Sequence, residues 1–116
     1  MLVEIDIKPG GPSNTINLNS NGVVSVAILG SEDLDVSEID QETLRFAGAS
    51  PKAKGKSGIG SFRDVNGDSY EDLVVHFLTQ DVQLSQGSQQ ATLTGQLLDG
   101  TALLGIDDVR IVGNSD

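Results

Sequence analysis

The chain has 116 residues, with seventeen Asp and Glu against seven Lys and Arg, and its formal net charge is −10 at neutral pH. This length predicts a single domain over residues 1–116, and this charge repels a phosphate backbone, which argues against a nucleic acid partner. The absence of Cys excludes thiol nucleophiles, disulfides and Cys-ligated zinc, and no apolar run approaches the ~18 residues of a membrane span.

Short segments of alternating apolar and polar residues dominate the first part of the chain, and this period of two predicts strands. Residues 3–7 alternate in this way, and so do residues 15–18. The dipeptide Asn21-Gly22 favours a tight turn, which would join residues 15–18 to the apolar run 23–29 as a hairpin. Because that run is apolar on nearly every position, we expect a central strand covered on both faces.

The segment after this run combines a helix signal with a loop. Asp35 followed by Glu38 is typical of a helix N-terminus and predicts one short helical turn ending by Gln41, before a strand over residues 43–47. Residues 49–58 contain Pro, Gly and three Lys and are expected to form an exposed loop. Its lysines favour a solvated rim, with a small anion-binding patch as the alternative.

The second half of the chain again predicts strands, at residues 59–65, 73–78, 91–98, 101–106 and 109–112. Asp99-Gly100 is expected to join two of them as a hairpin. Eight or nine short strands cannot bury their apolar faces in a single open sheet. The sequence therefore predicts an all-β fold, an antiparallel two-sheet β-sandwich of immunoglobulin-like or jelly-roll-like architecture.

One loop carries metal-binding chemistry. Side-chain oxygens of Asp64, Asn66, Asp68 and Asp72 occupy positions 1, 3, 5 and 9, and the main-chain carbonyl of Tyr70 stands at position 7. A curled loop with this spacing turns alternate oxygens inward, as a hard cation requires, and three carboxylates so close repel one another without a divalent ion. The spacing predicts a Ca²⁺ site formed by these five residues, with an acidic, solvated turn as the alternative.

The loop departs from the EF-hand pattern at two positions. Ser69 stands at position 6, where that pattern has Gly, and Val75 stands at position 12, where it has a bidentate Glu. Val75 falls in a predicted strand, so we expect the loop to join two strands. The remaining ligands would come from water or from another acidic residue, for which the candidates are Glu4, Asp6, Asp81 and Asp107.

Other polar residues give weaker indications of function. His76 is the single histidine, and no Ser has a nucleophile-elbow context, so a partly buried strand residue is expected and not a catalytic base. No pair of acids is set apart as in a glycosidase, so we expect no enzyme activity. Glu32, Asp33 and Asp35 are dense enough for a second ion, but their adjacency favours a solvated loop.

The acidic loop resembles known calcium loops. Residues 62–75, FRDVNGDSYEDLVV, resemble the calcium loop of FG-GAP repeats in integrin-type propellers and are similar to dockerin loops. A propeller needs many copies and a dockerin needs two, whereas this chain has one. The resemblance therefore implies the calcium chemistry of the loop and neither of those folds.

A wider pattern spans nearly the whole chain: IDIKPG at 5–10, GVVSVAIL at 22–29, VHF at 75–77, LTG at 93–95 and DG at 99–100. It resembles a C-terminal β-sandwich accessory module of secreted or surface bacterial proteins. That resemblance implies an extracellular, calcium-replete setting, no catalysis, and the remainder of a larger multidomain protein as partner.

We therefore expect a non-catalytic calcium-binding accessory module of a larger exported bacterial protein, secreted or at the cell surface. The alternative is a calcium-dependent carbohydrate-binding module appended to a polysaccharide-acting enzyme, whose ion would coordinate sugar hydroxyls or a uronate. With three Phe, one Tyr and no Trp, the chain has little material for stacking on sugar rings.

Overall fold

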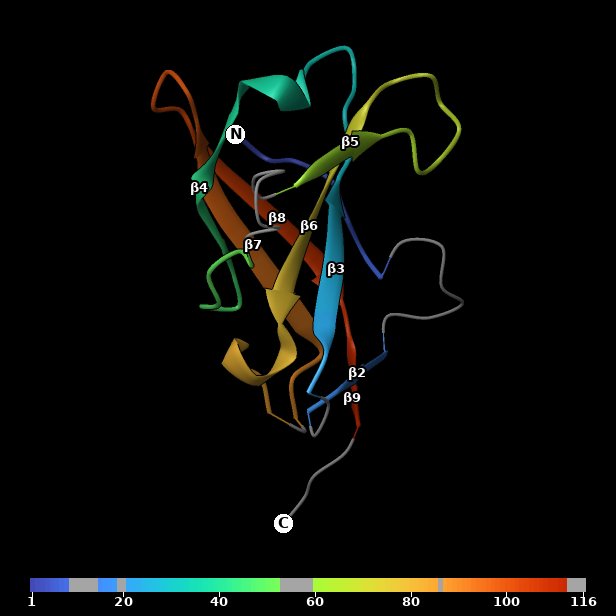
Figure 1. Cartoon of the computed structure of the whole chain (residues 1–116), viewed down its shortest axis with the longest axis vertical. Coiled ribbons are helices and arrows are strands. Elements are labelled where there is room, and N and C mark those ends of the chain that lie inside the picture. The colour runs from blue at the N-terminus through green and yellow to red at the C-terminus, as the bar shows by residue number, and fades with distance from the viewer. Residues whose placement is uncertain (9–14, 19–20, 53–59, 86, 113–116) are drawn as a thin grey trace.

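The computed structural model describes residues 1–8, 15–18, 21–52, 60–85 and 87–112, which form mostly strands and turns (Figure 1). The strands are β1 (Ile5–Ile7), β2 (Thr15–Asn17), β3 (Val23–Ile28), β4 (Ile39–Phe46), β5 (Ser61–Arg63), β6 (Asp72–Leu78), β7 (Gln90–Leu97), β8 (Ala102–Asp108) and β9 (Arg110–Val112). The 3-10 helices η1 (Val36–Glu38) and η3 (Thr79–Asp81) follow β3 and β6. The prediction of an all-β fold is confirmed.

Seven of these strands form two antiparallel sheets, in the orders β1-β3-β6-β5 and β4-β7-β8. Without β2 and β9, the seven remaining strands can be lettered A to G in chain order. The first sheet then has the order A-B-E-D, and the second sheet has the order C-F-G. This is the strand order of a constant-type immunoglobulin sandwich. The predicted antiparallel two-sheet sandwich is confirmed, and its strand order is that of the immunoglobulin-like alternative.

The core lies between the two sheets. Val24, Val26 and Ile28 are buried at alternate positions of β3, as a period of two requires. The Phe46 ring of β4 and the Phe77 ring of β6 lie with centroids 5.4 Å apart, so aromatic packing connects one sheet to the other. Burying side chains of this size stabilises the fold by roughly 1.5–3 kcal/mol each.

The central position predicted for residues 23–29 is confirmed, because β3 lies between β1 and β6. Its cross-strand pair Ala27 and Val74 is buried on the face that points away from the core residues of the same strands. Along this stretch both faces of β3 are therefore covered.

The predicted hairpin of residues 15–18 with residues 23–29 is wrong. β2 pairs in parallel with β9 instead, with Ile16 opposite Ile111. Ile16 is buried in the same core cluster as the sheet residues, and Ile111 packs against that cluster. The contact that buries Ile16 is long-range, and it overrides the local turn signal of Asn21-Gly22.

The N-terminal segment connects the edges of both sheets. The Val3 N–H donates to the Leu104 carbonyl and the Leu104 N–H to the Met1 carbonyl, each at 2.9 Å, which is a parallel pairing with β8. Residues of β1 then pair with β3 in the other sheet. Gly105 permits this passage, because a Cβ at this position would lie 2.7 Å from Ile5 Cγ2.

The remaining predicted elements are largely confirmed. The helical turn is shorter than predicted, since η1 ends at Glu38 and β4 begins at once. The hairpin through Asp99-Gly100 is formed by β7 and β8, with Gly100 at φ 91°. Most of the predicted loop 49–58, including Lys54 and Lys56 of its lysine rim and the alternative anion patch, lies outside the described residues.

Candidate metal centre

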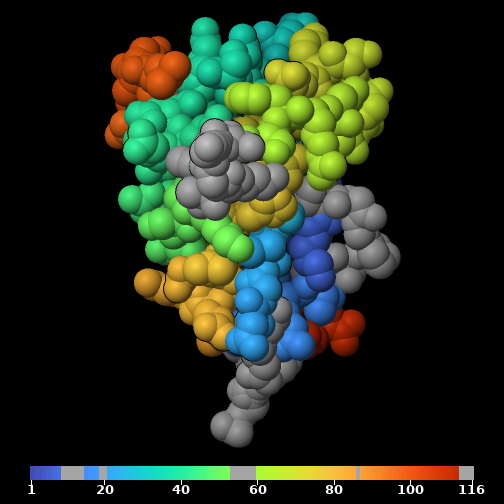
Figure 2. Space-filling view, in the orientation of Figure 1, coloured from blue at the N-terminus to red at the C-terminus, as the bar shows by residue number. Residues whose placement is uncertain are grey.

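The acidic loop links β5 and β6, which are antiparallel neighbours in the four-stranded sheet. Their pairing closes with Arg63 opposite Asp72, so residues 64–71 project from two fixed strand ends. The space-filling view shows this yellow-green segment at the surface of the upper part of the molecule (Figure 2). The sequence prediction that the loop joins two strands is confirmed.

Asp64 organises the first half of the loop. Its Oδ1 accepts a hydrogen bond from the Gly67 N–H at 2.8 Å, and its Oδ2 accepts one from the Ser69 N–H at 2.9 Å. These backbone donors, Ser69 above all, hold the pKa of the Asp64 carboxyl below its ordinary value. The carboxylate is therefore charged at neutral pH and holds the loop in a curl around itself.

The same pattern repeats at the next alternate positions. Asn66 Oδ1 accepts from the Asp68 N–H at 3.4 Å, and Asp68 Oδ1 accepts from the Tyr70 N–H at 2.9 Å. Each side chain thus turns back toward the backbone two residues further on. These hydrogen bonds hold the Asn66 and Asp68 side chains against the backbone of their own loop.

Ser69 adopts a left-handed backbone conformation in the acidic loop. Its φ is 73°, close to the 75° of Gly67. In the EF-hand pattern the same position is a Gly, which enters this left-handed region without penalty. The replacement by Ser therefore leaves the course of the backbone unchanged, at a cost of roughly 1–2 kcal/mol.

Asp72, the first residue of β6, anchors the loop to the body of the sandwich. Its side chain is fully buried. Its Oδ1 accepts from the Gly30 N–H at 2.7 Å and its Oδ2 from the Val65 N–H at 2.9 Å. These two bonds offset part of the cost of burying a carboxylate and tie the loop to the end of β3.

Sequence reasoning did not include Gly30 in the site. A Cβ at this position would lie 2.1 Å from the Glu71 carbonyl oxygen, so only Gly permits so close a contact between the two segments. No local sequence pattern indicates this contact, which follows from how the two strands are aligned. Gly30 comes two residues after Ile28, which lies opposite Leu73 in the β3–β6 pairing, and this register brings Gly30 to the start of β6.

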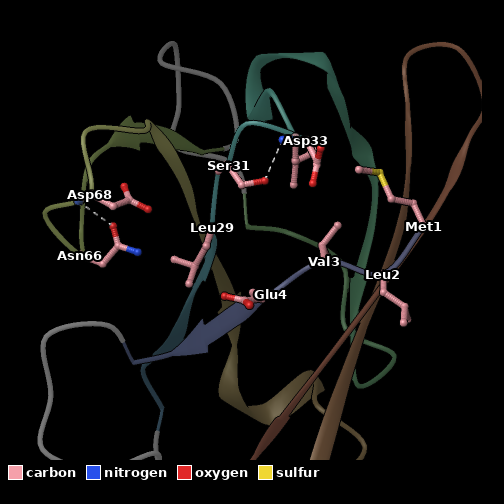
Figure 3. Close-up of a pocket in the computed structure, with 11 residues that line it drawn as sticks. Met1, Leu2, Val3, Glu4, Leu29, Ser31, Asp33, Asn66 and Asp68 are labelled. Atoms are coloured by element: carbon pink, nitrogen blue, oxygen red, sulfur yellow. Dashed lines mark hydrogen bonds between the residues drawn. The ribbon is translucent and has the colours of Figure 1, made fainter.

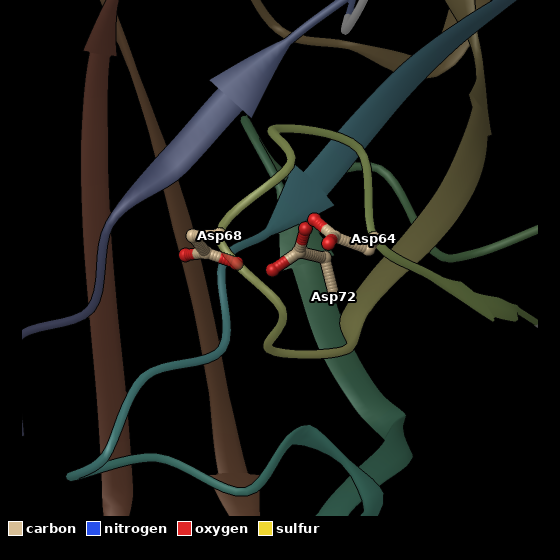
Figure 4. Close-up of side chains that lie close together, drawn as sticks. All are labelled: Asp64, Asp68 and Asp72. Carbon is tan, nitrogen blue, oxygen red and sulfur yellow. The ribbon is translucent and has the colours of Figure 1, made fainter.

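Three carboxylates converge within the loop. One oxygen from each of Asp64, Asp68 and Asp72 lies within 4.8 Å of the others (Figure 4). Two ligands on opposite sides of a calcium ion, at 2.3–2.6 Å from it, lie about 4.6–5.2 Å apart, so these oxygens fit within a single coordination shell. An all-oxygen donor set of this charge is suited to a hard divalent cation.

The other two predicted ligands lie in the same loop. Asn66 Oδ1 accepts from the Asp68 N–H, and Tyr70 is exposed. The cluster thus comprises three of the five predicted residues, and the ligand roles of Asn66 and Tyr70 remain predictions.

The four acids proposed as additional ligands lie in different places. Glu4 lines a cavity together with Asn66 and Asp68, so it lies beside the loop. Asp6 and Asp107 lie near each other. Burial is the main cause of the raised pKa of Asp6, and the charge of Asp107 is the second cause. Asp81 belongs to η3, after the far end of β6.

The remaining polar candidates have structural contacts. Ser25 Oγ and His76 Nδ1 form a hydrogen bond of 2.7 Å across the β3–β6 pair, a contact between facing strand residues that sequence reasoning missed. Asp35 caps η1 by accepting from the Ser37 N–H at 3.0 Å. Asp33 lies on the wall of the same cavity as Glu4.

Comparison of the chain with protein-family models, curated proteins and solved structures gives no match. The resemblance to an accessory module of exported bacterial proteins therefore remains a prediction. Among the described residues, no helix is both long enough and apolar enough to cross a membrane.

Proposed function

We propose that this domain is a calcium-stabilised, non-catalytic accessory module of a larger exported protein. The observation that supports the proposal is the convergence of Asp64, Asp68 and Asp72, whose oxygens lie within 4.8 Å of one another although the whole chain already carries a net charge of −10. Three carboxylates at such distances repel one another strongly, and a divalent cation between them converts this repulsion into attraction.

Calcium is the ion that suits the loop best. It accepts six to eight oxygens in a flexible shell, and the five predicted ligands with one or two waters supply that number. Magnesium requires a tighter, nearly octahedral arrangement and keeps most of its waters. Sites of modest affinity, with dissociation constants of ~10⁻⁴ to 10⁻³ M, serve extracellular modules where calcium is millimolar.

Bound calcium would act as a structural link. The ion would join the exposed half of the loop, through Asp64 and Asp68, to the buried Asp72, which is itself bonded to Gly30 at the end of β3. Two adjacent strands of one sheet would then be held at the same end by a single ion. The proposed role is to stiffen that end of the sandwich.

Isothermal titration calorimetry with calcium tests the proposal. The unaltered domain is expected to bind one ion, and Asp68→Asn is expected to weaken binding at least tenfold, because it removes a charged ligand from the shell. Glu42→Gln, an exposed acid on β4, is the matched control and should bind as the unaltered chain does. Absence of binding heat, or equal loss in both variants, would overturn the proposal. In a calcium-grown crystal, ligand distances of about 2.3–2.6 Å would identify the ion.

A further inference from the structure

A cavity of about 340 Å³ lies against the metal loop (Figure 3). Three separate segments form it: residues 1–4, residues 29–34 after β3, and the loop residues Asn66 and Asp68. Its volume falls within the range of ~300–1,000 Å³ that is common for ligand sites. Gly30 in its lining is the residue whose N–H binds Asp72, so the cavity and the metal loop share one framework.

The lining has two chemically distinct parts. One part is apolar and includes Val3, Leu29 and Leu34. The other carries three carboxylates, Glu4, Asp33 and Asp68, one from each segment, and the close-up shows those of Glu4 and Asp68 turned toward the hollow. Within the described part of the chain, no Lys, Arg or His side chain lines the cavity, and the ammonium group of Met1, which is in the lining, donates to the Ala102 carbonyl at 2.8 Å.

This combination disfavours two kinds of ligand and favours a third. Three carboxylates repel an anion such as a uronate, and the lining contains no aromatic ring on which a neutral sugar could stack. A cation on an aliphatic stem matches both parts, since its stem can contact the apolar wall while its charge meets the acids. Lysine has this form, and its compact charge suits a carboxylate.

We propose that this cavity binds a lysine side chain presented by a partner polypeptide. The net charge of −10 supports a basic partner, because it attracts one before contact and raises the rate of association. The site overlaps the proposed calcium site only in part, since Asp33 is not a predicted calcium ligand and Glu4 is only a candidate for an additional one. Asn66 and Asp68 belong to both.

The probe is the blocked peptide acetyl-Gly-Lys-Gly-amide, added to the ¹⁵N-labelled domain in calcium at low ionic strength. We expect saturable chemical-shift changes at the amides of Leu29, Gly30 and Ser31, which line the cavity. The matched peptide with norleucine keeps the stem and lacks the charge, and it should give no saturable change. High salt should weaken the binding of the lysine peptide, because it screens the attraction between the lysine charge and the carboxylates.

Two variants locate the charge recognition. Glu4→Gln and Asp33→Asn are each expected to weaken peptide binding about three- to fivefold, the effect of losing one exposed ion pair. Both side chains are exposed, so the variants should keep the fold, which an otherwise unchanged spectrum verifies. Glu42→Gln removes an acid of the other sheet and should change nothing.

Three results would overturn the inference: equal binding of the norleucine peptide, shifts confined to residues outside the cavity, or shifts of the cavity amides with a glucose or glucuronate oligomer but not with lysine. Failure of the calcium proposal is distinguishable from these results. If the calcium proposal fails, calorimetry shows no calcium binding, whereas the titration with the lysine peptide still measures how much Glu4 and Asp33 contribute to peptide binding.

Discussion

Asp72 combines full burial with a formal charge, and two backbone N–H groups satisfy its two oxygens. Asp72→Asn keeps one acceptor but places an amide NH₂ group against the second N–H donor. We expect this variant to lose about 2 kcal/mol of unfolding free energy even in chelator, the cost of an unsatisfied buried donor.

Urea unfolding in chelator measures this loss, and Asp68→Asn is the matched control. It removes the same charge from the same loop at an exposed position, so its change should stay within about 0.5 kcal/mol. Equal stability of the two variants would show that the bonds of Asp72 to Gly30 and Val65 contribute nothing.

Asp6 presents the opposite electrostatic situation. Its pKa is raised mainly by burial and secondly by the neighbouring charge of Asp107. The native state therefore binds the Asp6 proton more tightly than the unfolded chain does. Ionisation of Asp6 therefore destabilises the fold at pH 7, and this effect disappears as pH falls through the raised folded pKa to below the unfolded pKa of about 3.9.

We accordingly expect Asp6→Asn to stabilise the domain at pH 7 by a few tenths of a kcal/mol, a size typical of partly exposed substitutions, and to give no gain at pH 3. The comparison is between urea midpoints of the variant and the unaltered chain at each pH. A gain of equal size at both values would point to packing and not to charge.

Local spacing predicted the acidic cluster because the loop closes on itself within nine residues. Asp64 contacts Gly67 and Ser69, which are its near neighbours in sequence, so their arrangement follows from short-range geometry. The contact between Asp72 and Gly30 spans 42 residues and depends on how two strands are aligned. No local pattern carries that information.

At the scale of elements, Gly30 is the point where the end of β3 meets the start of β6. In Gly30→Ala the new Cβ would collide with a backbone oxygen, which cannot move as a side chain can. We expect a loss of at least about 2 kcal/mol, since a shift of either segment breaks the bond to Asp72, together with weaker calcium binding.

Gly87→Ala is the matched control, because a Cβ at that position meets nothing within 4 Å and its φ is not positive. Its stability should change by less than about 0.5 kcal/mol, measured in the same urea series. If both variants kept full stability and calcium affinity, the close contact at Gly30 would have no role in the site.

Apolar patterns located most of the strands. The continuous apolar run predicted β3, whose two faces are both covered, and alternation predicted strands such as those of the β7–β8 hairpin. The partner of β2 was not predictable from the same evidence. Residues 15–17 have the pattern of a strand, but their pairing with residues 110–112 requires the whole sandwich to be assembled first. The turn signal at Asn21-Gly22 described a local preference that this assembly overrides.

For the whole molecule, calcium binding and folding are linked through mass action. If the ion binds the native state alone, stability rises by about 2.7 kcal/mol when free calcium is a hundred times the dissociation constant. We expect the melting temperature to rise accordingly with calcium and to fall back with chelator, whereas for Asp68→Asn, which binds at least tenfold more weakly, the gain in stability should be smaller by at least about 1.3 kcal/mol. An unchanged melting temperature of the unaltered domain would contradict the structural role.

The parallel pairing of residues 1–3 with β8 has a mechanical consequence. Met1 lies toward the top of the view and β9, which follows β8, toward the bottom (Figure 1). Tension applied between these two points pulls two parallel segments in opposite directions along their own length. The hydrogen bonds at Val3 and Leu104 are then loaded in shear, all at once, and not peeled apart one after another. Tension along this axis would therefore be resisted by both hydrogen bonds together.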